Sequence, residues 1–168
     1  MNSAPGQYER LKRGFHAWLR GVQEYYGGDR LHQFVRAVEA VVKPEIGRSE
    51  ALFVHRCQIF AGTSEVARER LRELYHLRSQ TEHMNPFDSV LANYGPLDRE
   101  GIGLCRAYQS QLLASAVYER ILTTAGLQAI FDSDAHTDDF WRRRMHEQQA
   151  IWGDPIDLEA LAIARLQM

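Results

Sequence analysis

Apolar residues recur every three or four positions along most of this chain, which is the spacing of one face of an α-helix. Such segments cover residues 7–26, 30–42, 49–61, 63–84 and 98–124. No segment shows the strict alternation of a β-strand, and no internal repeat is visible. The sequence therefore predicts an all-α fold, an antiparallel bundle of four to five helices over residues 7–125.

Capping residues mark the expected helix boundaries. A glycine pair should end the first helix, and Asp29 is the expected N-cap of the second. Ser49 is placed to cap the third helix and Thr63 or Ser64 the fourth, because a hydroxyl oxygen there can accept a hydrogen bond from the first turn. Pro86 should stop the fourth helix.

Residues 126–168 differ in character from the rest. Residues 132–139 contain four aspartates and are expected to form an acidic linker. A short helix should follow, holding Phe140, Trp141, Met145 and Ile151, and then a final amphipathic segment from Ile156. We therefore expect residues 126–168 to form a short helical C-terminal appendage to the bundle.

Charge is unevenly distributed along the chain. The net charge of −2 argues against a protein that coats nucleic acid without specificity, because such binding needs a large excess of Lys and Arg. Residues 1–84 carry 13 Lys and Arg against 10 Asp and Glu, whereas residues 85–168 carry 7 against 12. The basic half is a weak indication of an anionic ligand, and a solvated surface of mixed charge is the more common explanation.

Composition also indicates the compartment. No apolar run approaches the roughly 18 residues of a membrane helix, and the N-terminus lacks the basic-then-apolar pattern of a secretory signal. Cys57 and Cys105 stand singly in apolar helical patterns, which is typical of free, buried thiols in a reducing compartment. We therefore expect a cytoplasmic protein with no membrane partner, and the absence of any Gly-rich phosphate loop or zinc-ligand spacing predicts no cofactor.

The segment from Leu74 to His83 is the strongest candidate for chemistry. At 100° per residue, Arg78 falls near the middle of the apolar face of its helix, where an arginine is rarely buried without a partner. Glu82 lies one turn further along that face, and His76 and His83 lie together on its flank. The simplest account is an Arg78–Glu82 ion pair at the rim of the bundle, with His83 an ordinary residue at the helix end.

The same residues also suit cleavage of RNA without a metal. The 2′-hydroxyl attacks the neighbouring phosphate once its proton is removed, and a histidine with a pKa near neutrality can accept that proton. The planar guanidinium of Arg78 can bind two phosphate oxygens, and the helix dipole favours protonated His83 in the last turn. Because one such pair is little for an active site, we expect a homodimer whose two Arg78 faces meet in a composite groove.

A longer pattern surrounds the pair. Leu74, Tyr75, Arg78, Ser79 and His83 form the sequence Leu-Tyr-x-x-Arg-Ser-x-x-x-His. This resembles the hallmark of the HEPN family, which is Arg followed by four to six residues and His, and most closely the form found in its Apea-like group. Residues 30–40 and 49–56 also look similar to helices that precede the motif in that group. The resemblance covers roughly residues 10–85.

The resemblance implies a function and a set of site residues. It implies a HEPN-like bundle acting as a dimeric, metal-independent endoribonuclease, often a toxin or anti-phage effector, with an antitoxin or a nucleotidyltransferase-type protein as a partner. It implies Arg78 and His83 as the catalytic pair, with Ser79 orienting the phosphate or His83. Arg56 matches an arginine common in the preceding helix, and a structural role is the more common one for it.

The chain also departs from the family pattern. The family often has Gly directly after the histidine, where this chain has Met84, and aliphatic residues before it, where this chain has Thr81 and Glu82. Glu82 can pair with Arg78 and mask it, or hold His83 in one tautomer. Since many HEPN-like proteins are not catalytic, the alternative is a scaffold that binds a nucleotide, RNA or a protein partner.

Two further groups can be weighed from spacing. His76 is a supporting or substrate-binding candidate, but it lies seven positions from His83, about 10 Å along a helix. That separation excludes a shared metal, whose ligands lie about 2 Å from the ion. Arg142, Arg143 and Arg144 are flanked by acidic residues, which is typical of a solvated helix face.

Overall fold

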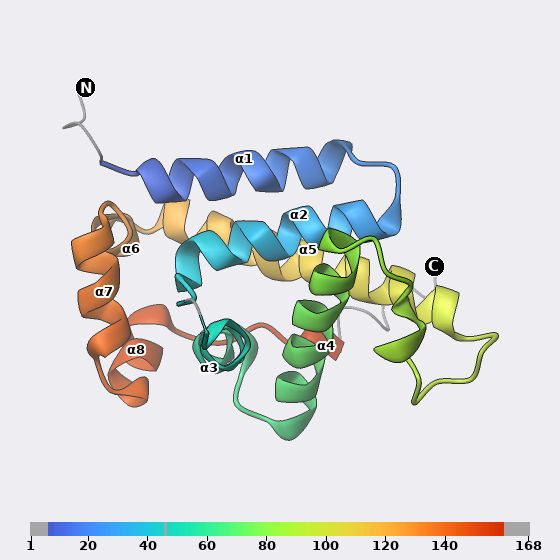
Figure 1. The fold of residues 1–168 in the computed structure, drawn as a ribbon. Coiled ribbons are helices and arrows are strands. Elements are labelled where there is room, and N and C mark those ends of the chain that lie inside the picture. Colours follow the sequence, from blue (N-terminus) through green and yellow to red (C-terminus); the bar gives the residue numbers. More distant parts are fainter. Residues whose placement is uncertain (1–6, 46, 160–168) are drawn as a thin grey trace.

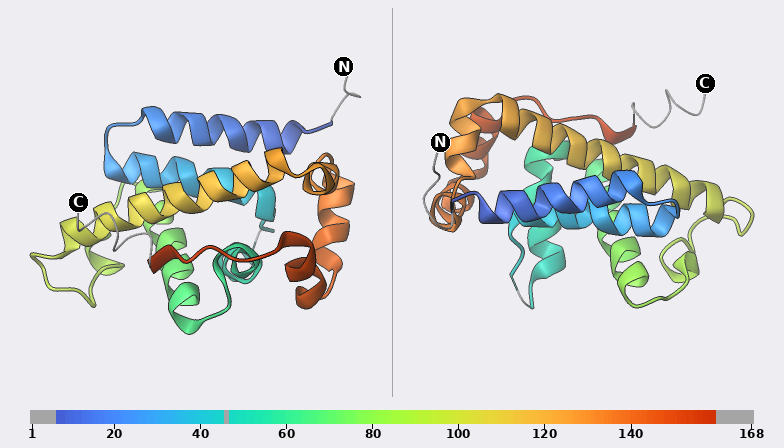
Figure 2. Two further views of the ribbon diagram at one scale, coloured as in Figure 1. Left: turned by 180° about the vertical axis from the view of Figure 1, so that it is seen from behind. Right: turned by 90° about the horizontal axis from the view of Figure 1, so that it is seen from above.

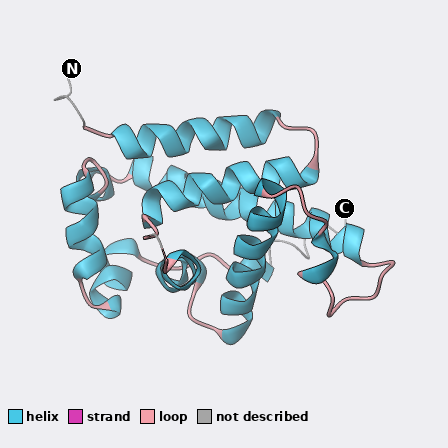
Figure 3. Cartoon of the chain, in the orientation of Figure 1, coloured by secondary structure: helices cyan, strands magenta, loops and turns pink. Residues whose placement is uncertain are grey.

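The computed structural model describes residues 7–45 and 47–159, and every regular element in these ranges is helical (Figures 1 and 3). In chain order the elements are α1 (Glu9–Gln23), α2 (Gly27–Val42), α3 (Ser49–Ala61), α4 (Glu65–Glu82), the short 3-10 helix η1 (Phe87–Ser89), α5 (Arg99–Thr123), α6 (Ala125–Ile130), α7 (Asp134–Arg142) and α8 (Met145–Trp152). The predicted all-α class is confirmed. Within the described ranges, no helix is both long enough and apolar enough to cross a membrane.

Helix α2 lies at the centre of the fold. It packs against α1, α4 and α5 and also touches α3. Its apolar side chains are almost completely buried, namely Leu31, Phe34, Val35, Val38, Val41 and Val42. Figures 1 and 2 show α1, α2 and α5 lying alongside one another, while α3 and α4 run across them. The aligned part is thus smaller than the four or five antiparallel helices expected.

Helix α1 contacts α2 through glycines that the apolar pattern did not reveal. A Cβ atom on Gly21 would lie 2.8 Å from the ring of Phe34, and one on Gly14 would clash with the Tyr118 hydroxyl. Leu11, Gly14 and Gly21 are buried at the helical spacing of one face, whereas three apolar residues of segment 7–26 are exposed. Those exposed residues are Leu19, Val22 and Tyr25. The missing glycine side chains let α1 approach closely along a face that hydrophobicity alone does not mark.

The predicted caps are confirmed in one case out of three. The Ser64 hydroxyl accepts a hydrogen bond of 3.1 Å from the Ala67 amide and caps α4, as expected. Asp29 is not a cap, because α2 begins earlier, at Gly27, and leaves Asp29 in the first turn. Ser49 is the first residue of α3, and its hydroxyl donates to the Glu45 carbonyl at 2.8 Å instead of capping the helix.

The expected acidic linker at residues 132–139 is mostly helical. Ser133 accepts a hydrogen bond from the His136 amide and caps α7, which begins at Asp134. Two of the aspartates pair with cations from other segments, Asp134 with Arg10 on α1 and Asp138 with Lys43 at the end of α2, each at 2.7 Å. An acidic first turn suits the positive end of a helix, so the run of aspartates starts a helix here.

The expected single helix after residue 139 is divided into α7 and α8 by a break at residues 143 and 144. Its aromatic residues enter the same core as the first five helices. Trp141 Nε1 donates to the Val41 carbonyl at 3.0 Å, and the ring centroids of Trp152 and Phe60 lie 4.3 Å apart. The final segment from Ile156 begins with a backbone hydrogen bond to Phe60, and residues 160–168 lie outside the described ranges.

Candidate functional site

Arg78 lies between two carboxylates. Helix α4 directs it toward α2, where its Nη2 lies 3.1 Å from Glu39 Oε2, and its Nη1 donates to the Glu82 carboxylate. The Arg78–Glu82 ion pair expected from spacing is therefore present. Glu39 is a second partner that helical spacing could not reveal, because it comes from another helix. Both side chains of the Arg78–Glu39 pair are largely buried, with 17% and 15% exposed.

The two carboxylates beside Arg78 differ in burial. Burial raises the pKa of Glu39, and the nearby Glu82 adds to this rise while Arg78 opposes it. Arg78 Nε is buried and has no hydrogen-bond partner in the part of the chain that the structure describes. Arg36 also lies close enough to lower the pKa of Glu39, so two arginines face the two glutamates. Because both carboxylates pair with Arg78, its guanidinium is less available to a phosphate.

His83 lies directly after the end of α4. It is the C-cap residue, its amide donates to the Ser79 carbonyl at 3.2 Å, and its side chain is exposed. Its imidazole makes no hydrogen bond or ion pair with other described residues. At 100° per residue, five positions separate Arg78 from His83 by about 140° around the axis. Within one protomer the two side chains therefore leave α4 in different directions.

A left-handed residue closes α4 immediately after His83. Met84 has φ +55°, its amide donates to the Thr81 carbonyl at 3.1 Å, and the Asn85 amide donates to Gln80 at 2.9 Å. This pair of hydrogen bonds is the Schellman motif, which usually places glycine in the left-handed position. The chain therefore ends α4 in a conformation that favours glycine, but with a methionine side chain there.

A different histidine lies beside Arg78. His32 on α2 is partly buried, and its Nδ1 has no hydrogen-bond partner among the described residues. Burial lowers the pKa of His32, and the charges of Arg78 and Arg36 lower it further, against a backbone hydrogen bond at Arg78 that raises it. The sequence carried a signal for this group, since His32, Arg36 and Glu39 share one face of α2 at spacings of four and three.

A small polar pocket of about 320 Å³ opens on the Arg78 side of α2. Its lining includes Arg10, Arg13, Arg36, Glu39 and Arg78. Arg10 is paired with Asp134, the first residue of α7, and Arg78 is paired as described above. The free cationic character of this pocket therefore comes from the exposed Arg13 and Arg36.

The remaining predicted residues lie apart from one another. Arg56 donates hydrogen bonds of 2.6 and 2.7 Å to the last carbonyls of α2, those of Val42 and Lys43, and its guanidinium lies 5.3 Å from the Trp141 ring centroid. Arg56 therefore caps the C-terminal end of α2 and makes no contact with His83. His76 is partly exposed, and its Nε2 lies 3.4 Å from a Glu50 carboxylate oxygen.

The described residues were also compared with metal-ligand geometry, and the chain with known proteins. Within residues 7–45 and 47–159, no three or more His, Cys, Asp or Glu side chains are grouped so that they could hold a metal ion. No protein-family model, no curated protein and no solved structure matches the chain.

Proposed function

We propose that the chain is an RNA-binding helical module of HEPN type that does not cleave RNA. The observation that carries the second half of this proposal is the Arg78 guanidinium, held by Glu39 and Glu82. Cleavage at an Arg–His site needs an arginine charge that the phosphate can use. Here that arginine already forms ion pairs with two carboxylates.

The free energy of its ion pairs decides whether an arginine can bind a phosphate. Breaking a largely buried ion pair by removing one partner costs about 3–5 kcal/mol. If a phosphate had to release Arg78 from Glu39, a cost of even about 3 kcal/mol would weaken its binding roughly 100-fold. Ion pairs on the surface contribute only about 0–1 kcal/mol, so arginines in such pairs can exchange partners at little cost.

The exposed basic side chains lie on another face of α4. Arg68, Arg72, His76 and His83 recur at spacings of four, four and seven, which brings them to one side of the helix. The first three have 43–47% of their side chains exposed, and His83 is exposed as well. Arg68 pairs with Glu65 at 3.1 Å and Arg72 with Glu50 at 3.6 Å, both at the surface. This face supports the first half of the proposal, binding of a phosphate backbone.

The test is RNA binding and cleavage by the same protein. We expect fluorescence anisotropy to show binding of a single-stranded RNA that weakens with rising salt, and we expect no fragments from that RNA in EDTA. Arg72→Ala should weaken binding, whereas Arg142→Ala, which removes an exposed charge from α7, should not. Absence of RNA binding at low salt would overturn the proposal, and so would equal effects of the two variants.

A second candidate function is the metal-independent endoribonuclease that the Leu74–His83 signature implies. The observation that favours it is the exposed, unpaired imidazole of His83, which is accessible for proton transfer. This function would require a homodimer that brings an arginine from elsewhere to His83, and it fits a toxin or anti-phage effector with an antitoxin or nucleotidyltransferase-type partner. Discrete RNA fragments in EDTA from the wild type, lost in a folded His83→Ala variant, would establish this function in place of the first.

A further inference from the structure

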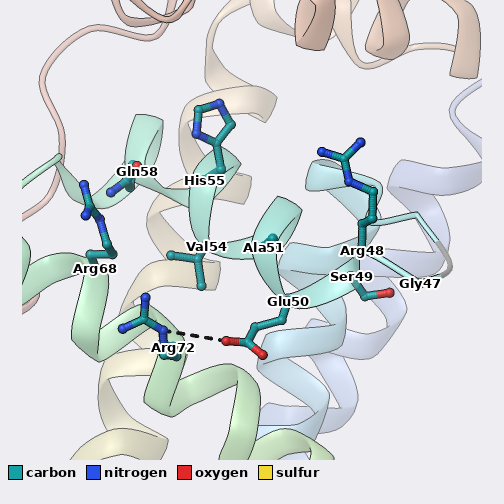
Figure 4. A pocket seen from close by; sticks show the side chains of 10 residues that line it. All are labelled: Gly47, Arg48, Ser49, Glu50, Ala51, Val54, His55, Gln58, Arg68 and Arg72. Carbon is teal, nitrogen blue, oxygen red and sulfur yellow. Dashed lines mark ion pairs between the residues drawn. The ribbon is translucent and has the colours of Figure 1, made fainter.

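A second pocket lies between α3 and α4, away from Arg78. Its volume is about 580 Å³, within the range of small-molecule sites. Figure 4 shows the side chains that line it. Arg48, Glu50, His55 and Gln58 come from α3 and the residue before it, and Arg68 and Arg72 come from α4. Three arginines and a histidine thus surround one open space, with a single carboxylate.

The arginines of this pocket are exposed and can exchange partners at little cost. Arg48 makes no ion pair within the described ranges and is exposed. Arg68 and Arg72 are each paired with one surface glutamate and keep 44% and 47% of their side chains exposed. The carboxylate of Glu50 lies 3.6 Å from Arg72 and 3.4 Å from His76, so it offsets one of the three arginine charges. The pocket therefore carries a net positive charge toward solvent.

Gln58 provides a second, independent observation. Its side chain lines the pocket, the residue is only 5% exposed, and its Nε2 has no hydrogen-bond partner among the described residues. A buried amide donor without a partner costs about 1–3 kcal/mol. Buried polar groups of proteins are nearly always paired, so an unpaired donor on a pocket wall indicates an acceptor that the pocket receives.

We infer that the α3–α4 pocket binds the phosphate group of a nucleotide, either free or within RNA. Arginines recognise phosphate through paired hydrogen bonds, and the unpaired Gln58 amide is a further donor in the pocket wall. A volume of about 580 Å³ leaves room for the attached nucleoside. The RNA form of this inference rests on the proposed function, and it locates the phosphate contacts at a pocket distinct from the Arg78–His83 segment.

The variants separate binding from folding and from net charge. Arg48→Ala with Arg68→Ala removes two pocket cations. Arg142→Ala with Arg143→Ala removes the same charge from exposed positions on and just after α7 and serves as the matched control. Gln58→Met keeps the length of the side chain but removes the donor. Because the donor is unpaired, we expect Gln58→Met to leave the thermal midpoint unchanged or raised while phosphate binding falls. A purely structural Gln58 would show the opposite, a lower midpoint.

The probes are AMP, adenosine, and one RNA oligomer with and without a 5′-phosphate, at fixed ionic strength. We expect AMP to bind at least about 10-fold more tightly than adenosine, because charged hydrogen bonds are worth that much. The Arg48/Arg68 variant should lose this difference and the Arg142/Arg143 variant should keep it. Competition between AMP and the phosphorylated RNA would place an RNA end in the pocket, and equal binding of both RNA forms would indicate backbone phosphates.

The outcomes distinguish the pocket from the proposed function. RNA binding that neither AMP nor the Arg48/Arg68 variant affects would overturn the pocket and leave the RNA-binding module standing. AMP binding that depends on the pocket, without RNA binding, would support the pocket for free nucleotides and overturn the RNA-binding module. No preference of the wild type for AMP over adenosine, together with no RNA binding, would overturn both.

Discussion

Replacing Met84 with glycine should stabilise the protein. Met84 closes α4 with φ +55°, a region that side chains with a Cβ atom enter only at a cost. For L-residues this cost is about 1–2 kcal/mol. Glycine adopts the conformation without it, but loses about 0.5–1 kcal/mol more conformational entropy on folding. The difference favours glycine by about 1 kcal/mol.

Packing does not change this sum. The Met84 side chain is 94% exposed, so its removal exposes little apolar surface and leaves no cavity. The two hydrogen bonds that close the helix are made by the Met84 and Asn85 backbone amides, and a glycine retains both. For a chain of this length, about 1 kcal/mol corresponds to a rise in the thermal midpoint of roughly 2–4 °C.

Thermal and urea unfolding of Met84→Gly and wild type measure this difference. Met84→Ala is the control, because alanine also has a Cβ atom and should gain almost nothing. An increase in stability for both variants would assign the effect to loss of the methionine side chain. A decrease for glycine alone would show that the left-handed conformation carries no strain at this position, and the argument from backbone geometry would fail.

Three further predictions concern the polar contacts of α2. Arg56→Met should lower the free energy of unfolding by about 3 kcal/mol, because it removes two charged hydrogen bonds from the end of α2, and Arg56→Lys should lose less; urea titration measures both. The pKa of Glu39 is raised on folding, so ionising this carboxyl costs stability. Wild type should therefore lose stability relative to Glu39→Gln as the pH rises from below 4.5 through the folded-state pKa. Urea titrations between pH 4 and 7 can measure this loss. The pKa of His32 is lowered on folding, so pH affects stability in the opposite direction. Acidification below pH 6.5 should destabilise wild type, and His32→Gln should remove that part of the pH dependence in the same titrations.

Sequence periodicity predicted the elements of this fold better than their contacts. The helix spans through α5 were expected nearly as they are, because apolar spacing and breakers such as Gly62 mark them locally. Apolar spacing does not predict the close approach of α1, because Gly14 and Gly21 have no apolar side chain. The aspartates of residues 132–139 predict a solvated linker, but the segment starts a helix, and Asp134 and Asp138 pair with Arg10 and Lys43.

The candidate site shows the same division. Spacing along one helix predicted the Arg78–Glu82 pair, since both residues lie on α4. It could not predict Glu39, because a contact between helices depends on how α2 and α4 cross. Burial of the Arg78–Glu39 pair follows from that crossing too. A signature of spaced residues therefore fixes which side chains are present, whereas their charge state and availability depend on neighbours distant in sequence.

Releasing Arg78 tests whether two carboxylates alone hold back cleavage. The variant Glu39→Gln with Glu82→Gln keeps hydrogen-bond acceptors near the guanidinium but removes both negative charges. We expect this protein to show no RNA cleavage in EDTA, because Arg78 and His83 still leave α4 about 140° apart and cannot meet on one phosphate within a protomer. RNA binding should rise, since the local charge becomes positive. Fragments that appear in the double variant and vanish when His83→Ala is added would contradict this, and would show that the glutamates restrain a nuclease assembled across two protomers.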